Sequence, residues 1–212
     1  AVVLQKGKIQ GIVAKTYLSN SNECSEKRWF GSTHDIKNTK VWLCGDLVEI
    51  NQYCIFNTPS CSFAIEMGHD LFAPIPPSSQ LSMMGAEIVL NLSAESVLAG
   101  KDDYLRNQIS SQSARCIGGY VYAGAGFGES STDIVFNAQA LIYENGKMLA
   151  ENLPFCTESQ LVFSEIDIEH IRSERRRNNV FSDSAKISLT KECVFIDTDM
   201  MVNHSFELSR TY

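Results

Sequence analysis

Few side chains in this sequence have both the chemistry of a catalytic group and a suggestive setting. Lys15 directly follows the apolar run G-I-V-A, so we expect it at the end of a buried strand. A lysine there could stabilise an anion, although such residues are commonly edge side chains whose stems cover apolar surface. A serine triad is not indicated, because no G-x-S-x-G motif occurs and no histidine has an obviously prepared setting. On local context alone, Lys15 is the strongest catalytic candidate.

The 7 cysteines and 4 histidines are the possible nucleophiles and metal ligands. No C-x-x-C pair occurs and the histidines are scattered, whereas a zinc site needs clustered ligands. Cys44 and Cys54 lie among apolar neighbours, which is typical of reduced core thiols in a cytosolic protein. We therefore predict no metal site. No apolar run approaches the ~20 residues of a membrane span, so we expect a cytoplasmic protein without a membrane partner.

Two further motifs suggest phosphate or nucleic-acid binding, and both are weak. Residues 124–128 read G-A-G-F-G, but a dinucleotide fingerprint needs its third glycine one residue later and a helix to follow. The arginine-rich residues 172–177 include Glu174 and predict a solvated helix face or an interface. The 18 basic and 25 acidic side chains leave a net charge of −7, which repels a phosphate backbone. We therefore exclude nucleic acid as a partner.

The elements that position these groups indicate one α/β domain. A chain of 212 residues with 44% hydrophobic content can close a substantial core. Asn145-Gly146 predicts a type I′ hairpin turn, and Ser78-Ser79 would cap a short helix. Periodicity predicts strands at residues 1–4, 9–15, 40–44, 47–50, 53–56, 62–66, 87–92, 120–123, 134–144, 147–150 and 161–166, and helices at 78–84, 101–117 and 168–177.

Several longer motifs follow one another between residue 1 and about residue 182. They are G-I-V-A-K-T-Y-L at 11–18, E-M-G-H-D-L-F-A-P-I-P-P-S at 66–78, G-A-E-I-V-L-N-L-S-A at 85–94, G-K at 100–101, G-E-S-S-T-D at 128–133 and I-R-S-E-R at 171–175. In order and spacing they resemble the glutaminase module of glutamine-dependent NAD synthetase, which is a nitrilase-type (carbon–nitrogen hydrolase) module.

The resemblance implies a four-layer α-β-β-α sandwich that hydrolyses the side-chain amide of glutamine with a Glu, Lys, Cys triad. The thiolate attacks the amide, the carboxylate moves protons and the lysine stabilises the oxyanion. The ammonia would pass to a synthetase module. Lys15 falls on the catalytic lysine and Glu23 on a second glutamate that supports it. By the same resemblance Tyr17, Phe72 and Lys101 line the glutamine pocket.

The sequence departs from this family at the nucleophile. Gly68 occupies the cysteine position, so no thioester can form there, and His69 replaces an acidic neighbour. We interpret His69 as a solvent-exposed substitution that could still contact substrate. Glu95 stands where a small polar residue is usual, and its carboxylate would repel that of glutamine. Together with Ser19, Ser21, Cys24 and Ser25, these departures predict drift after the loss of selection on glutamine hydrolysis.

The expected boundaries and function follow from the same resemblance. The family's catalytic glutamate lies far upstream of the lysine, so we expect a module incomplete at its N-terminus. Residues 1–182 would form the carbon–nitrogen hydrolase domain, and residues 183–212 an extension or linker with a possible strand at 194–196. The ATP-binding loop S-G-G-x-D-S is missing, so ATP and Mg would belong to a synthetase module. The implied function is glutamine hydrolysis supplying ammonia for NAD synthesis, catalytically impaired and homo-oligomeric. The alternatives are a silent scaffold or regulatory subunit, and a generic small-amide hydrolase.

Overall fold

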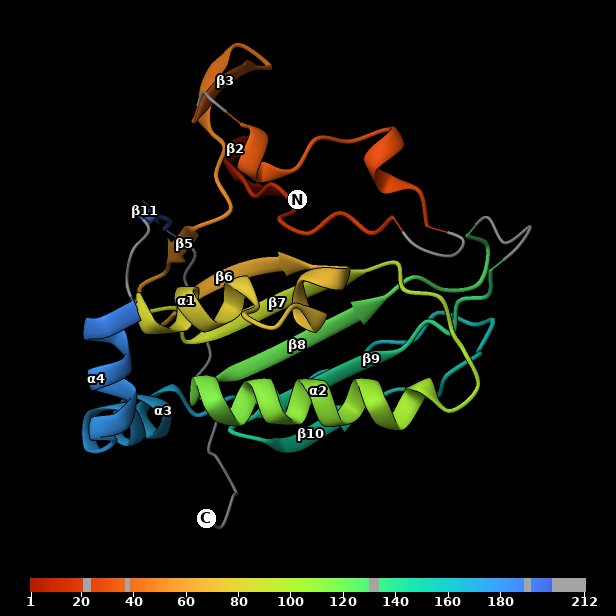
Figure 1. Ribbon diagram of the computed structural model, residues 1–212. Helices are drawn as coiled ribbons and strands as arrows, with labels where there is room; N and C mark the ends of the chain where they lie inside the picture. The colour runs from red at the N-terminus through yellow and green to blue at the C-terminus, as the bar shows by residue number, and fades with distance from the viewer. Residues whose placement is uncertain (21–23, 37–38, 130–133, 189–191, 200–212) are drawn as a thin grey trace.

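A mixed β-sheet with two helices against one face organises the computed structural model (Figure 1). The structure describes residues 1–20, 24–36, 39–129, 134–188 and 192–199. The sheet has seven strands in the order β10-β9-β8-β7-β6-β5-β11. Strands β6, β7 and β8 are parallel, as are β5 and β11. The strands span Cys54–Asn57 (β5), Ser62–Met67 (β6), Ile88–Ser93 (β7), Gly119–Gly124 (β8), Ala140–Glu144 (β9), Lys147–Glu151 (β10) and Val194–Asp197 (β11).

The helices lie on one face and at one end of this sheet (Figure 1). Helices α1 (Pro77–Met83) and α2 (Lys101–Cys116) cover the face, and α3 (Ile168–Arg177) and α4 (Asn179–Ser188) lie at the end. The prediction that Ser78 caps α1 is wrong. Pro76 is the N-cap and Pro77 the first helical residue, because proline has a helix-compatible φ and needs no hydrogen bond for its nitrogen.

The alternation of side chains along β6 separates two cores. Ala64 packs with Leu81 of α1 on the helical face. Its neighbour Ile65 packs with Phe56 and Val13 on the opposite face. There the hairpin of β1 (Val2–Gln5) and β2 (Lys8–Ile12) adds a second, two-stranded sheet. The described residues thus form helical, sheet and partial second-sheet layers, and the predicted α/β class is confirmed.

Most of the predicted helices and strands are present, and two predicted stretches of strand are absent. Asn145 and Gly146 have φ values of 46° and 86° in the predicted hairpin turn between β9 and β10. Residues 134–139 and 161–166, by contrast, form no strand. Leu161 and Phe163 are exposed, and the segment 161–166 pairs with no strand of the described sheets. A third sheet, which also has two strands, pairs β3 (Lys40–Leu43) with β4 (Asp46–Glu49).

The predicted division into a domain at residues 1–182 and an extension or linker at residues 183–212 stays a prediction. Helix α4 spans the boundary at 182/183. The strand expected at 194–196 is confirmed as β11, which pairs in parallel with β5 and so belongs to the main sheet.

The arginine-rich helix α3, predicted to present a solvated face or an interface, has both exposed and inward-facing arginines. Arg176 and Arg177 are exposed, whereas Arg172 and Arg175 contact the rest of the fold. Arg172 binds Glu87 at 2.6 Å. The guanidinium of Arg175 donates to four backbone carbonyl groups where α1 and α2 end and β7 begins, those of Ser82, Ala86, Cys116 and Ile117. A planar donor group with five N–H bonds can satisfy carbonyl oxygens in several directions at once. Arg175 therefore joins α3 to the helical layer.

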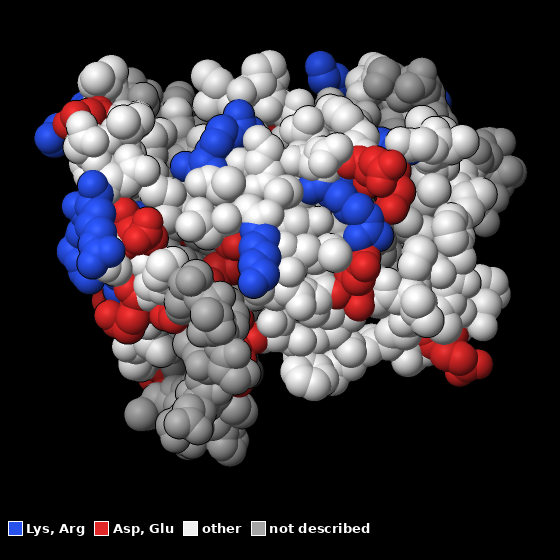
Figure 2. Space-filling model, turned by 90° about the horizontal axis from the view of Figure 1, so that it is seen from below, with Lys and Arg blue, Asp and Glu red and all other residues white. Residues whose placement is uncertain are grey.

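On the face shown in Figure 2, basic side chains adjoin acidic ones instead of forming a continuous basic patch.

Among the residues described here, none of the helices has both the length and the apolar character needed to cross a bilayer.

We predict that Arg175→Lys destabilises the fold. Lysine has the charge but a single donor centre, so buried carbonyl groups would lose their partners. The free energy of unfolding, measured with urea, should fall by about 2–4 kcal/mol. Arg177→Lys is the matched control, because the side chain of Arg177 is 78% exposed. Equal stabilities for the two variants would contradict this role.

Candidate functional site

The candidate site surrounds an elbow where β6 ends and the short helix η3 (Gly68–Phe72) begins. Gly68 has φ +49°, in the left-handed region, and donates its N–H to Asn91 Oδ1 at 3.1 Å. A Cβ atom at position 68 would lie 3.5 Å from Lys15 Nζ and 3.2 Å from Glu95 Oε1. A side chain here would therefore point into a cluster of charged groups, and glycine places no atoms there.

Lys15 reaches this cluster from the segment that follows β2 of the small β1–β2 sheet. Its Nζ donates to Glu26 Oε1 at 2.7 Å, and the other oxygen of Glu26 accepts the backbone N–H of Ser19 at 2.7 Å. One carboxylate therefore holds Lys15 and Ser19 side by side. Glu26 was not predicted from the sequence, which pointed to Glu23. Glu23 lies outside the described residues, and Glu26 follows it by three positions in the sequence.

Asp70 attaches the Lys15 segment to the elbow. Its buried carboxylate accepts N–H groups from Tyr17 at 2.7 Å, Met67 at 3.2 Å and Thr16 at 3.5 Å. Burial raises the pKa of Asp70, and these three bonds and the charge of Lys15 oppose that rise. Asp70 was not predicted as a site residue, although its side chain fixes the distance between β2 and the elbow.

A buried polar chain supports the elbow from the helical side. Asn91 Nδ2 donates to the Tyr120 hydroxyl at 2.9 Å, and that hydroxyl donates to Glu66. Glu66 also accepts the backbone N–H of Ser78 at 2.9 Å. Burial raises the pKa values of both Glu66 and Tyr120. Each member of the chain has a partner, so the elbow backbone is held in one orientation.

His69 is a bonded member of the site, which corrects its interpretation as a solvent-exposed substitution. Its Nδ1 contacts Glu95 Oε1, and its Nε2 lies 3.4 Å from Ser19 Oγ. The ring packs edge-on against Phe72, with centroids 5.8 Å apart. Two-thirds of the side chain is buried, since 33% of it is exposed.

Glu95 is ionised and closely surrounded by cationic groups. Burial disfavours its charged form, but the hydrogen bond and charge of His69 and the charges of Lys101 and Lys15 hold the pKa of Glu95 below its usual value. Lys101 Nζ lies 3.5 Å from Glu95 Oε2. The predicted repulsion of a substrate carboxylate is therefore partly offset by these neighbours.

The other predicted pocket residues divide into two groups. Lys101 Nζ lies 5.5 Å from the ring centroid of Phe72, so both belong to the cluster. Tyr17 contributes its backbone N–H to Asp70, while its exposed ring packs edge-on against His34 at 6.2 Å. The structure thus brings Lys15, Gly68, His69, Phe72, Glu95 and Lys101 together and turns the ring of Tyr17 elsewhere.

The native thiols with perturbed acidity are poor nucleophiles. Burial raises the pKa of Cys54 to about 12 and the pKa values of Cys116 and Cys193 to about 11. In the described part of the chain, no group of three or more His, Cys, Asp or Glu residues is arranged to hold a metal ion.

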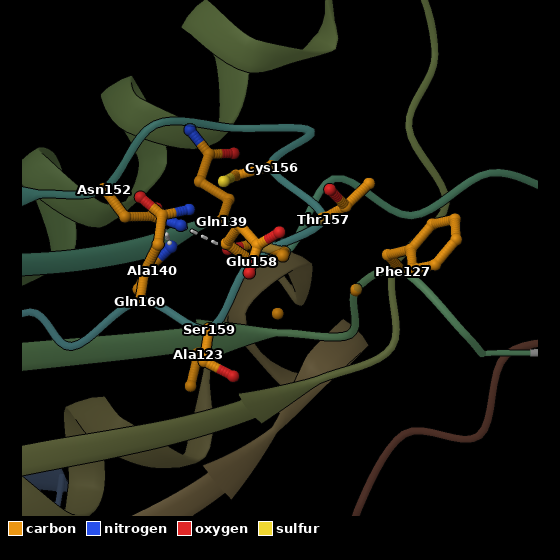
Figure 3. A pocket seen from close by; sticks show the side chains of 13 residues that line it. Ala123, Phe127, Gln139, Ala140, Asn152, Cys156, Thr157, Glu158, Ser159 and Gln160 are labelled. Carbon is orange, nitrogen blue, oxygen red and sulfur yellow. Dashed lines mark hydrogen bonds between the residues drawn. The ribbon is translucent and has the colours of Figure 1, made fainter.

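A cavity of about 340 Å³ lies beside the ends of β8 and β9 (Figure 3). Its amide side chains already have structural partners: Asn152 bonds the backbone of Ala138 and Ala140. The N–H groups of Gly124 and Ala125 donate to backbone carbonyl groups, and among the described residues no helix lies between β8 and β9. These N–H groups are therefore not free to bind a phosphate, and the elbow is the better candidate site.

Comparison with known proteins places the chain. It is 34% identical over 189 residues to the glutamine-dependent NAD(+) synthetase of Mycobacterium tuberculosis, a match covering 88% of this chain and 28% of that protein. A glutamine-dependent NAD(+) synthetase from Cytophaga hutchinsonii has a similar fold, with TM-score 0.62 and 23% identity over 71% of this chain and 24% of that one. A carbon-nitrogen hydrolase from Helicobacter pylori gives TM-score 0.65 and 16% identity over 86% and 60% of the two chains. The sequence matches no protein-family model.

The predicted resemblance is confirmed. The chain is related in sequence to glutamine-dependent NAD(+) synthetases and spans about 28% of the length of the curated relatives it matches. Its fold is similar to the folds of the Cytophaga hutchinsonii synthetase and of the Helicobacter pylori carbon-nitrogen hydrolase. The catalytic and substrate-binding roles of individual residues stay predictions.

We predict that Gly68→Ala lowers stability without disturbing the surrounding sheet. A left-handed φ costs a residue with a Cβ about 1–2 kcal/mol, and the new methyl group would also press on Glu95. Urea denaturation should show a loss of at least this size. Gly31→Ala is the control, because Gly31 lies in open space without a left-handed φ. A neutral Gly68→Ala would show that the elbow relaxes freely.

Proposed function

We propose, on the premise that this chain is related to glutamine-dependent NAD(+) synthetases, that it receives the side-chain amide of glutamine and serves the supply of ammonia for NAD synthesis. We further propose that the thioester step of nitrilase-type hydrolysis is absent, because Gly68 offers no nucleophile. Lys15, supported by Glu26, would polarise the amide carbonyl. Phe72 and Lys101 would border the rest of the substrate.

One observation carries this proposal: the Cβ direction at Gly68 leads to Lys15 Nζ at 3.5 Å. A lysine ammonium beside an elbow position is the arrangement that stabilises an oxyanion formed at that position. The surroundings of this position are polar, since Lys15 Nζ, Glu95 Oε1 and Ser93 Oγ are the three atoms nearest to a Cβ placed there. Such polar groups can contact the oxygen and the nitrogen of an amide.

A second candidate is a silent nitrilase-type module that scaffolds or regulates an ammonia-using synthetase. The same glycine favours it, because a site without a nucleophile can retain its fold and its binding surface. In this case the parent protein would be active with ammonia and inactive with glutamine. A generic small-amide hydrolase is the weaker alternative. Under each of these proposals, steps that need ATP and Mg would take place in a synthetase module. Homo-oligomerisation and a cytoplasmic location are further proposals from the family.

The proposal is tested by placing a thiol at the elbow. In Gly68→Cys the introduced thiol would lie beside Lys15, and iodoacetamide, itself a small amide, should alkylate it. Bound L-glutamine should slow this alkylation by about tenfold at saturation, as measured by peptide mass spectrometry, because the amide would occupy the same space. Adding Lys15→Met should remove the protection.

Gly31→Cys is the matched control, since Gly31 lies in open space. Its alkylation should not respond to glutamine. If millimolar L-glutamine leaves the alkylation of Gly68→Cys unchanged, the site does not receive the glutamine amide and the proposal fails.

A further inference from the structure

Three side chains that depart from the family pattern meet in space. Ser19 lies after β2, His69 at the elbow and Glu95 after β7. They are far apart in the sequence, and Ser19 and His69 are separated by 50 positions. In the fold, His69 contacts Glu95 through Nδ1 and approaches Ser19 Oγ through Nε2, at 3.4 Å. The order serine, histidine, carboxylate is that of an acyl-transfer triad, which is recognised by geometry and not by sequence position.

The surroundings fix the roles of the three groups. Because Glu95 is ionised, it accepts a hydrogen bond from His69 Nδ1. In the tautomer that carries its single proton on Nδ1, Nε2 is an acceptor for the Ser19 hydroxyl. Glu95 is held in place in turn by Lys101 at 3.5 Å. The Ser19 backbone is fixed by Glu26 at 2.7 Å. A nucleophile–base distance of 3.4 Å is within the looser range found without substrate.

A cation lies where negative charge would develop. Glu26 holds both the Ser19 N–H and Lys15 Nζ, each at 2.7 Å. A Cβ atom at Gly68 would lie 3.5 Å from Lys15 Nζ and 3.2 Å from Glu95 Oε1. A carbonyl group bound beside Gly68 would therefore have the Lys15 ammonium close to its oxygen, and the Ser19 hydroxyl would approach its carbon from the side of His69.

We propose that Ser19, His69 and Glu95 form a serine-type acyl-transfer site that replaces the missing thiol. The proposal rests on the proposed function in using the same amide-receiving space. Ser19 is the nucleophile, His69 the general base and acid, and Glu95 a positioning residue that holds the histidine tautomer. Lys15 is the oxyanion donor.

The reaction balances with water as the second substrate. Ser19 Oγ forms a bond to the carbonyl carbon of the amide, and its proton passes to His69 Nε2. The C–N bond then breaks as His69 returns the proton to the nitrogen, releasing ammonia and leaving an acyl-serine ester. Water attacks the ester with His69 taking its proton, the C–Oγ bond breaks, and the carboxylic acid leaves while Ser19 regains its proton.

The charges around the site favour an uncharged acyl group. Lys15 is paired with Glu26, and Lys101 with Glu95. No surplus positive charge therefore faces the open space from these two lysines. An acyl group without net charge, as in a zwitterionic amino-acid amide or a small neutral ester, fits this balance better than an acyl group with a net negative charge.

The experiment uses the 212-residue chain with a fluorophosphonate probe and with p-nitrophenyl acetate, a small neutral ester. The fluorophosphonate should label Ser19, as read by peptide mass spectrometry. Saturable release of p-nitrophenolate should fall about 100-fold or more in Ser19→Ala and His69→Gln, the size of a general-base contribution. Glu95→Gln should lower kcat while KM changes by less than about twofold, because a positioning residue acts on the chemical step.

Ser60→Ala is the matched control, since Ser60 lies in an exposed turn between β5 and β6 without a histidine partner. It should leave labelling and hydrolysis unchanged. Ser19→Ala should fold normally, because the bond to Glu26 comes from the Ser19 backbone. Labelling at another serine, or hydrolysis by Ser19→Ala at the original rate, overturns the proposal.

The two proposals fail separately. If L-glutamine protects the thiol of Gly68→Cys but Ser19 is neither labelled nor needed for hydrolysis, the triad is wrong and the silent binding module remains. If Ser19 is labelled and required while glutamine gives no protection, the triad stands and glutamine is not its substrate.

Discussion

The site depends on the buried carboxylate of Asp70, which joins two separate parts of the fold. Lys15 follows the small β1–β2 sheet, whereas Gly68 ends a central strand of the main sheet. Asp70 accepts N–H groups from Thr16 and Tyr17 on one side and from Met67 on the other. Its position therefore fixes the separation of the lysine and the elbow. Three donors on one carboxylate also explain why a charged group is tolerated at 1% exposure.

Turn residues and helical periodicity correctly predicted those elements whose conformation depends on residues close together in the sequence. The Asn145-Gly146 turn and the helix 168–177 match β9–β10 and α3, because turn chemistry and helical periodicity act over a few residues. Residues 134–139 and 161–166 have strand-like patterns but no strand, since a strand also needs a partner edge that local sequence does not specify. The inward contacts of Arg172 and Arg175 in α3 could not be predicted for the same reason. Their acceptors on Glu87, Ala86 and Cys116 come from distant parts of the chain.

Motif register identified the position of Lys15 and the elbow at Gly68, but it could not identify the contacts made there. Glu26 supports Lys15 through a short helix whose orientation depends on tertiary packing. The resemblance placed His69 and Glu95 at the same pocket from two different motifs, but it did not predict that their side chains touch. A comparison with family positions shows which residues have changed, whereas only the fold shows which of the changes are neighbours.

The contacts of Glu95 explain how a carboxylate is accommodated beside Gly68. The side chain of Glu95 is only 9% exposed, and an unpaired carboxylate with so little solvent would carry a desolvation cost. His69 and Lys101 offset that cost by contacting its two oxygens. A Cβ atom at position 68 would approach Glu95 Oε1 to 3.2 Å, so glycine at this position avoids a close contact with the carboxylate. The glycine and the His69–Glu95 pair are therefore sterically and electrostatically compatible.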